Sequence, residues 1–526
     1  MTGLCRWAFA LLLWAAGASV AHAAPAATTV AARAQEVDRL LGEWRIEEAA
    51  ALTHRLGAIA PGHPRVLAAS GAVLFHQGQY DAALALLRAA ERGQRGLAAR
   101  FRPLTELVRS TAEAVKGFVE KKSPSGHFRI RTARGKDELL VPFAIETLEA
   151  IREALAKDLG YAPPGTVLVE IYPRAEELAR VSTLTQKEIE RSGTVALCKY
   201  DRLMAVSPRA LLRGYPWRDT LAHEYVHLVV SRASRNTVPI WLHEGLAKLF
   251  EVRWRLGPEE EVPLGPTQEH LLAEALAARR LVGWSEMHPS MAKLPDQRST
   301  ALAFAQVHTA LAYLKERAGL PGLRRLLGAL RAGRDDWLAV HQVATLPPGG
   351  FERAWRKYLR GLKLRRLPGL VPAELTFGTP RTKEQELAAL REQRAKRHFR
   401  LADLLRQRKL LPAAILEYER ARDAAGERDA FVSNALARSF LEVDQPARAI
   451  AALSPVLEYY PDLSGPQVTM GAAYLRRGDP RAATRHLKVA LRLNPFDPEV
   501  HCGLSRALPA GPEAERHGRL CSTLVE

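Results

Sequence analysis

The sequence predicts a mostly α-helical protein with one small α+β domain in its middle. Three observations predict this class: a 34-residue spacing recurs near the C-terminus, short β-branched runs gather between residues 127 and 207, and helical periodicity fills most of the remainder. The 526 residues are 47% hydrophobic and 25% charged, which is globular composition with enough length for about three domains.

The first 23 residues predict a secretory signal peptide. Arg6 precedes an apolar run at residues 7–20 that is too short to span a bilayer, and residues 21–23 (AHA) form a cleavage pattern. We expect cleavage after Ala23, with an uncleaved anchor as the alternative. No later segment approaches 18 uninterrupted apolar residues. We therefore expect export to the periplasm or the extracellular space, without stable membrane insertion after cleavage.

The net charge of +19 is spread along the chain without a block of five or six like charges. We interpret it as a solvated surface with a weak preference for anionic envelope components, and export argues against a nucleic-acid partner. Cys198, Cys502 and Cys521 remain after the predicted cleavage, and their spacing is not that of a metal site. Cys502 and Cys521 are candidates for a disulfide in an oxidising compartment.

Helical repeats are expected at both ends of the chain. A spacing of 34 residues separates Pro412, Pro446 and Pro480, and likewise Ala449 and Ala483, and Leu453 and Leu487. The pattern resembles the tetratricopeptide repeat (TPR), in which small residues let paired helices approach and proline stops the second helix. We expect TPR repeats at residues 397–526 and, from weaker spacing, TPR-like helical hairpins at residues 24–120. A generic helical bundle is the alternative.

Residues 121–366 are expected to form the α+β domain. Alternating or β-branched segments predict strands at residues 127–132, 166–172, 194–198 and 203–207, with a tight turn near residues 200–201. Helical periodicity covers residues 137–159 and most of the chain after Pro208. Strands followed by helices are typical of an α+β domain. The proline-containing residues 367–396 are expected to be a linker.

A candidate metal site lies in LAHEYVHLVV, residues 221–230. On a helix His223 and His227 lie about 40° apart, so both imidazoles can reach one zinc ion. Glu224 lies on the same side and can act as a general base without being a ligand, which is the logic of H-E-x-x-H. The alternative is an ordinary helix with two partly exposed histidines. The apolar helix disfavours it, because buried polar groups need partners.

A third ligand is expected from the next helix. Catalytic zinc takes three protein ligands and keeps one position open. Pro239 begins a second helix, PIWLHEGLAKLFE, in which Glu244 follows His227 by 17 positions. Gly245 would let two helix backbones approach closely. A helix that returns antiparallel would place Glu244 opposite the two histidines.

Three neighbouring side chains are considered as further ligands or as supports of the predicted ligands. Glu251 is a candidate ligand or a hydrogen-bond acceptor behind a ligand. His243 lies about 100° around the helix from Glu244 and is expected to point elsewhere. Asp219 is expected to cap the first helix, with the orientation of His223 as its alternative role.

The two motifs together, HEYVH and WLHEGLA, resemble the gluzincin metallopeptidases and in particular the peptidase MA-like domains of bacterial exported proteins. The resemblance covers roughly residues 123–362 and implies an α+β zincin-like metallopeptidase domain. Carried over by position, it implies that His223, His227 and Glu244 bind Zn²⁺ and that Glu224 is the catalytic base.

The sequence does not assign the residue that donates a hydrogen bond to the oxyanion. Related enzymes supply a tyrosine or a histidine, and where they often have tyrosine this chain has Phe304. His308, Tyr313 and Tyr200 are candidates. The resemblance also implies that the strand at residues 203–207 pairs through its edge with an extended peptide.

The sequence therefore predicts an exported zinc metallopeptidase that acts on a peptide or protein substrate, with TPR-like repeats that dock the substrate or a protein partner. The alternative is an envelope scaffold that acts through its repeats, with a peptidase-like domain that binds zinc with little turnover. The intact Glu224 favours the enzyme, because a binding module needs no base there.

Overall fold

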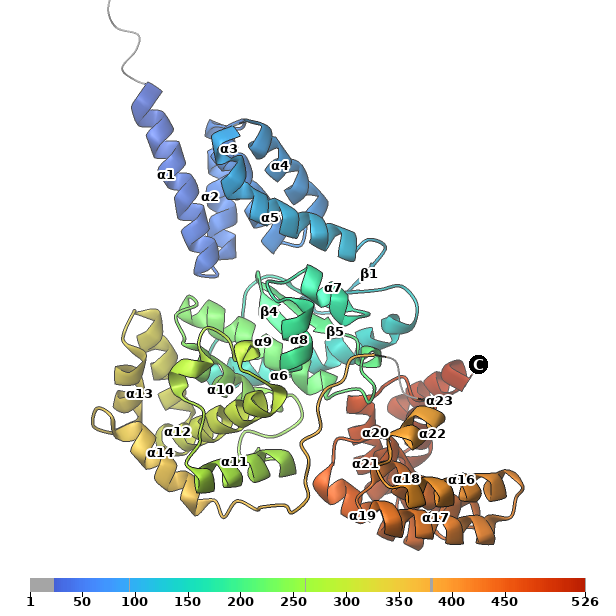
Figure 1. Cartoon of the computed structure of the whole chain (residues 1–526). Helices are drawn as coiled ribbons and strands as arrows, with labels where there is room; N and C mark the ends of the chain where they lie inside the picture. Colours follow the sequence, from blue (N-terminus) through green and yellow to red (C-terminus); the bar gives the residue numbers. More distant parts are fainter. Residues whose placement is uncertain (1–22, 94, 261, 379–381, 526) are drawn as a thin grey trace, which may run out of the picture.

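The computed structural model of the chain describes residues 23–93, 95–260, 262–378 and 382–525. These residues form the predicted class, a mostly helical protein with a small mixed sheet between two groups of helices (Figure 1). The predicted signal peptide lies outside the described residues except for Ala23, and stays a prediction. Within the described ranges, no helix has both the length and the apolar character that crossing a membrane requires.

The N-terminal helices are α1 (Ala23–Gly42), α2 (Ile46–Ile59), α3 (Pro64–His76), α4 (Tyr80–Gly93) and α5 (Arg95–Ala114). Gly71 on α3 packs against α4, where a Cβ added to Gly71 would come within 2.8 Å of the Leu87 Cγ. This contact of a small residue with a large one is the one that the repeat pattern predicts.

The C-terminal helices form successive hairpins: α16 (Gln393–Gln407), α17 (Leu411–Ala425), α18 (Ala430–Glu442), α19 (Pro446–Tyr459), α20 (Ser464–Arg476), α21 (Pro480–Leu493), α22 (Pro498–Ala507) and α23 (Pro512–Val525). A Cβ added to Gly471 would come within 2.6 Å of the Leu487 Cγ, so Gly471 packs on Leu487 as Gly71 does on Leu87. Pro446 and Pro480 begin helices α19 and α21, where the first helical N–H needs no partner within the helix, and Pro461 and Pro495 follow the ends of these two helices.

The sheet has the strand order β1-β2-β3-β5-β4. Its strands are β1 (Val119–Lys122), β2 (Phe128–Thr132), β3 (Val167–Tyr172), β4 (Ala196–Lys199) and β5 (Arg202–Val206). The two outer pairs are antiparallel and the pairs β2–β3 and β3–β5 are parallel. The four predicted strands are confirmed within two residues, and Tyr200 and Asp201 form the turn, both with positive φ. The sequence did not predict β1.

The predicted edge strand is wrong. β5 lies inside the sheet, because β3 pairs with one side of it and β4 with the other. The hairpin places β4 outermost at this end of the sheet. Any peptide that adds to this end must therefore pair with β4.

The helices nearest the sheet are α6 (Leu140–Leu159), which follows the 3₁₀ turn η1 (Lys136–Leu139), and α9 (Trp217–Ser234). Around them lie α7 (Ala175–Arg180), α8 (Gln186–Ser192), η2 (Pro208–Ala210), α10 (Ile240–Phe250), α11 (Pro266–Ala278), η3 (Trp284–Met287), η4 (Met291–Lys293), α12 (Gln297–Arg331), α13 (Asp336–Ala344) and α14 (Gly350–Gly361). Helix α9 is buried over most of its surface, which suits a helix at the centre of a domain.

The predicted linker packs along the central domain. The Leu212 N–H donates to the Thr376 carbonyl at 3.0 Å, and the Gly378 N–H donates to the Ala210 carbonyl at 2.8 Å. A short helix, α15 (Lys383–Ala389), also falls within the predicted linker. Val468, Leu487 and Val500 of the C-terminal helices share one core with the central domain.

Candidate metal centre

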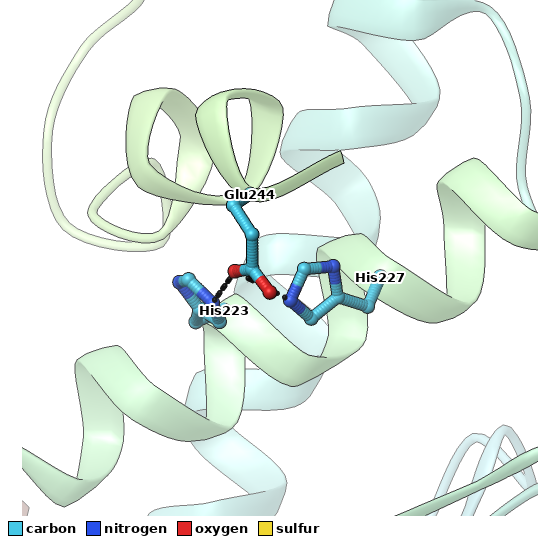
Figure 2. Close-up of side chains that lie close together, drawn as sticks. All are labelled: His223, His227 and Glu244. Carbon is cyan, nitrogen blue, oxygen red and sulfur yellow. Dashed lines mark hydrogen bonds and ion pairs between the residues drawn. The ribbon is translucent and has the colours of Figure 1, made fainter. Parts of the chain in front are cut away.

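Helices α9 and α10 bring the three predicted metal ligands together. His223 and His227 on α9 face Glu244 on α10, and the Nε2 atom of each imidazole lies 3.2 Å from the Glu244 Oε2 (Figure 2). One ligand atom from each of the three residues lies within 4.8 Å of the other two. Two imidazoles and a carboxylate at this spacing can hold one metal ion with a position left open.

Glu251 lies behind His223. Its Oε2 is 2.9 Å from the His223 Nδ1, and its Oε1 accepts a hydrogen bond from the Lys248 ammonium at 2.5 Å. Of the two roles that the sequence left open for Glu251, the structure places it as the acceptor. A His223 that donates through Nδ1 keeps Nε2 free for a metal.

His243 lies behind His227, although the sequence predicts that it points elsewhere. Its Nδ1 is 2.5 Å from the His227 Nδ1, and its Nε2 is 3.1 Å from the Ser231 Oγ. The prediction fails because α10 crosses α9 closely enough for two successive side chains to face it. Burial, with a contribution from His227, lowers the pKa of His243 to about 3. The neutral His243 ring can thus accept from the His227 Nδ1–H and donate to Ser231, which leaves the His227 Nε2 free.

The charges of the triad favour a cation. Burial by itself raises the pKa of Glu244, but the adjacent His227 and His223 outweigh it and hold that pKa well below its usual range. Burial by itself lowers the pKa of His223, but hydrogen bonds with Glu244 and Glu251 raise it to about 10. The two carboxylates therefore stabilise a positive charge between them.

Glu224 supplies a buried oxygen that needs a partner. Its Oε2 has no hydrogen-bond partner among the described residues, whereas the backbone N–H of Cys198 on β4 bonds to the carboxylate. Burial raises the pKa of Glu224, and His227 and His223 act in the opposite direction. An unpartnered buried carboxylate oxygen is costly unless a polar group or water meets it. The donor set and this oxygen fit a zinc ion with a water beside it.

A cavity of about 1980 Å³ contains the candidate metal centre. Its walls come from all parts of the chain: Trp44 and His76 from the N-terminal helices, residues 196–199 of β4, residues 371–376 of the predicted linker, and residues 459–463 and 489, 492 and 493 of the C-terminal helices.

The three predicted oxyanion donors lie in different surroundings. His308 lines the cavity, and its buried Nδ1 has no partner among the described residues. Burial, with a contribution from Lys248, lowers the pKa of His308 to about 4. Tyr200 lines the cavity but packs on Phe75, with ring centres 5.0 Å apart. Tyr313 does not line it and packs on other aromatic rings, those of Phe351 and Tyr358.

Asp219 neither caps α9 nor orients His223. The helix begins at Trp217, three residues earlier than the capping prediction requires, so Asp219 lies within the first turn. Its carboxylate accepts hydrogen bonds from the Trp254 Nε1 at 2.9 Å and from the Arg255 guanidinium at 3.0 and 3.1 Å.

Three cavity residues were not predicted as part of the site from the sequence: Lys248, Cys198 and Arg492. Lys248 follows Glu244 by one helical turn, so helical spacing could have identified it. Phe304 lies against His223, with ring centres 6.1 Å apart. Cys198 and Arg492 reach the cavity from a strand and from a distant repeat. No local signal marks these two, because the fold alone brings them there.

Solved structures with partial likeness to the chain include yeast LTA4 hydrolase in complex with bestatin, with 15% identity and a TM-score of 0.30 over 77% of this chain and 64% of that one. The chain thus covers less than two thirds of the yeast protein. The TPR domain of P58(IPK) matches with 13% identity and a TM-score of 0.20, over 94% of this chain and 99% of that one. The APC/C hetero-tetramer Cut9–Hcn1 matches with 12% identity and a TM-score of 0.24, over 95% and 81%. No curated protein matches the chain.

The central domain has a match of its own. Residues 148–361 match the Peptidase MA superfamily. The matched segment contains α9 and α10, and with them His223, His227 and Glu244. These residues therefore form a Peptidase MA superfamily domain with a candidate metal-binding triad.

Proposed function

We propose that the chain is a zinc metallopeptidase of gluzincin type that hydrolyses peptide bonds. The observation that carries this proposal is the buried Glu224 oxygen without a partner, next to the triad of His223, His227 and Glu244. A domain that held zinc for structural reasons would need four protein ligands and no base. The superfamily match over residues 148–361 supports the same conclusion.

The residues of this chain divide the reaction between them. A zinc ion held by the triad would supply Lewis-acid polarisation of the peptide carbonyl and ease the ionisation of water. Glu224 takes the proton of the attacking water and delivers it to the leaving amine. Its raised pKa suits this exchange, since a base must also be able to act as an acid. Of the predicted oxyanion donors we favour His308, because it lines the cavity and its neutral ring has an N–H that can donate.

The peptide would lie along β4. This strand ends the sheet and lines the cavity next to Glu224. Extended peptides bind such strands through backbone hydrogen bonds. The antiparallel hairpin with β5 fixes β4 in place.

The proposal includes export and docking by the repeats. Export rests on the predicted signal peptide at residues 1–23, and it is supported by the disulfide between Cys502 and Cys521, the two cysteines that are candidates for pairing in the sequence. Disulfides persist in oxidising compartments such as the periplasm or the extracellular space. Docking of a substrate or a partner protein rests on the paired helices at both ends.

Zinc content and cleavage of a mixed peptide library test the proposal, on the wild type and on Glu224→Gln. We expect about one zinc in both proteins, because Glu224 is not a ligand. The variant should lose cleavage by roughly 10²–10⁴-fold, the usual contribution of a general base. Glu374→Gln makes the same change on an exposed part of the cavity wall and should cleave normally.

Two results would contradict the peptidase. If both proteins hold zinc and neither cleaves, the scaffold alternative takes its place. If neither protein holds zinc, the triad is not a metal site.

A further inference from the structure

Arg492 is a positively charged residue of the cavity wall, and its ion pair with an acidic side chain is long. It lies near the C-terminal end of α21, and its side chain is 21% exposed. Its ion pair among the described residues is with the Asp219 Oδ2, at 3.9 Å. This separation is well beyond hydrogen-bond distance, so the guanidinium keeps its donors available to the cavity.

Asp219 is already occupied by other donors. Its Oδ1 accepts from Trp254 and Arg255, and its Oδ2 accepts from Arg255. The single negative charge of this carboxylate is therefore balanced by Arg255. The positive charge of Arg492 has no close carboxylate of its own among the described residues. A partly buried charge without a close partner is costly, and an anionic ligand offsets that cost.

The other charges near Arg492 do not compensate this positive charge. Burial lowers its pKa, Asp219 and Asp462 act against that, and Arg255 lowers it further. Asp462 lines the same cavity but forms no ion pair with Arg492 among the described residues. An arginine with a reduced pKa remains protonated at neutral pH. Its full charge thus faces the cavity.

Arg492 lies near the candidate metal centre, through its contact with Asp219 on α9. Asp219 precedes His223 by four residues on α9, which is about 6 Å along the helix axis. The Arg492 Nε lies 3.9 Å from the Asp219 Oδ2, and both residues line the cavity. An extended peptide advances about 3.4 Å per residue. Because Arg492, His223 and Glu224 line the same cavity, Arg492 can contact a peptide residue within a few positions of the bond that is cut.

We propose that Arg492 is a specificity-determining residue that binds a carboxylate of the peptide, either an acidic side chain or the C-terminal carboxylate. The planar guanidinium binds a carboxylate through two parallel hydrogen bonds. The inference rests on the proposed peptidase function and names a preferred class of substrate for the same cavity. It also makes the C-terminal repeats part of the substrate site, through α21.

The test measures peptide binding to the full zinc-loaded chain with Glu224→Gln, so that cleavage does not interfere. Fluorescent peptides are compared in matched pairs. In the first kind of pair, glutamate is compared with glutamine at each of three positions on either side of the central residue of the peptide. In the second kind, a peptide with a free C-terminal carboxylate is compared with its C-terminal amide. We expect the acidic member of one pair to bind about tenfold more tightly, as for one charge-assisted pair of hydrogen bonds. The pair that shows the preference identifies the source of the carboxylate.

Variants of Arg492 connect the preference to this residue. Arg492→Gln should abolish it, and Arg492→Lys should keep part of it, because the charge remains while the paired geometry is lost. Arg485→Gln, on the exposed side of the same helix, should keep the full preference. Thermal unfolding of each variant shows that the fold is retained.

The inference is overturned if no pair shows a preference, or if the preference survives in Arg492→Gln. Cleavage by the protein with Glu224 intact is measured separately. If that protein does not cleave but the preference appears and depends on Arg492, the anion site stands and the peptidase proposal fails. If it cleaves without the preference, the peptidase stands and the anion site fails.

Discussion

At the scale of single residues, each of the two candidate histidine ligands is held by a second side chain. Glu251 holds His223 and His243 holds His227, in both cases through Nδ1, so that both Nε2 atoms point to Glu244. The sequence motif names the ligands but not these supports. His243 is the residue next to Glu244, and Glu251 follows Glu244 by two helical turns, at the C-terminal end of α10.

Replacement of Glu251 by glutamine should weaken zinc binding about 10–100-fold, the usual effect of losing a support behind a ligand. The amide keeps the shape of the side chain but loses the charge that His223 and Lys248 contact. Competition with a chromophoric chelator measures the affinity. Glu316→Gln, at an exposed position on α12, is the control and should bind zinc as the wild type does. Equal affinity in Glu251→Gln would show that Glu251 does not support the site.

At the scale of elements, the position of α10 depends on a glycine. A Cβ added to Gly245 would lie 2.4 Å from the Leu311 Cδ2 and 3.0 Å from the Val307 carbonyl, both on α12. The sequence predicts a close helix approach at this glycine, and the structure shows that α12 is the helix it meets. This approach fixes how far Glu244 projects towards α9.

Gly245→Ala should therefore destabilise the protein by about 1–3 kcal/mol, since a methyl group forced into a packed contact must displace its neighbours. Urea unfolding measures the change. Gly328→Ala makes the same substitution on α12, where nothing lies within 4 Å of the added Cβ. That control should stabilise the helix by about 0.5–1 kcal/mol. Similar effects of the two changes would contradict the close packing of α10 on α12.

At the scale of the whole molecule, the C-terminal repeats are joined to the segment that leads into α9. The Tyr215 N–H donates to the Leu493 carbonyl at the end of α21, at 3.3 Å. Gly214, with a φ of +68°, lies so close that an added Cβ would be 2.1 Å from the same carbonyl. The Arg516 guanidinium also lies 3.9 Å from the Phe143 ring centre on α6. The C-terminal repeats thus support the central domain as well as lining its cavity.

Gly214→Ala should disturb this junction more than its positive φ alone explains. Gly117→Ala is the matched control, because Gly117 has a φ of +80° and nothing within 4 Å of an added Cβ. Both changes carry the cost of a left-handed alanine, about 1–2 kcal/mol. Gly214→Ala should cost about 1–3 kcal/mol more, from the clash with Leu493. Urea unfolding measures the free energy of unfolding of both variants. Equal decreases in the two variants would mean that the C-terminal repeats do not pack closely against the loop at Gly214.

The sequence by itself determined local features: four of the five strands, the repeat spacing, and the candidate ligands His223 and His227, because a helix fixes side chains four residues apart on one side. It also placed Glu244 in the right helix. Tertiary structure alone decided that β4 is the edge strand, that His243 and Glu251 support the ligands, and that Arg492 reaches the cavity. These depend on how separate elements cross and pack. Sequence periodicity describes which side of an element is apolar, but it does not state which other element covers that side.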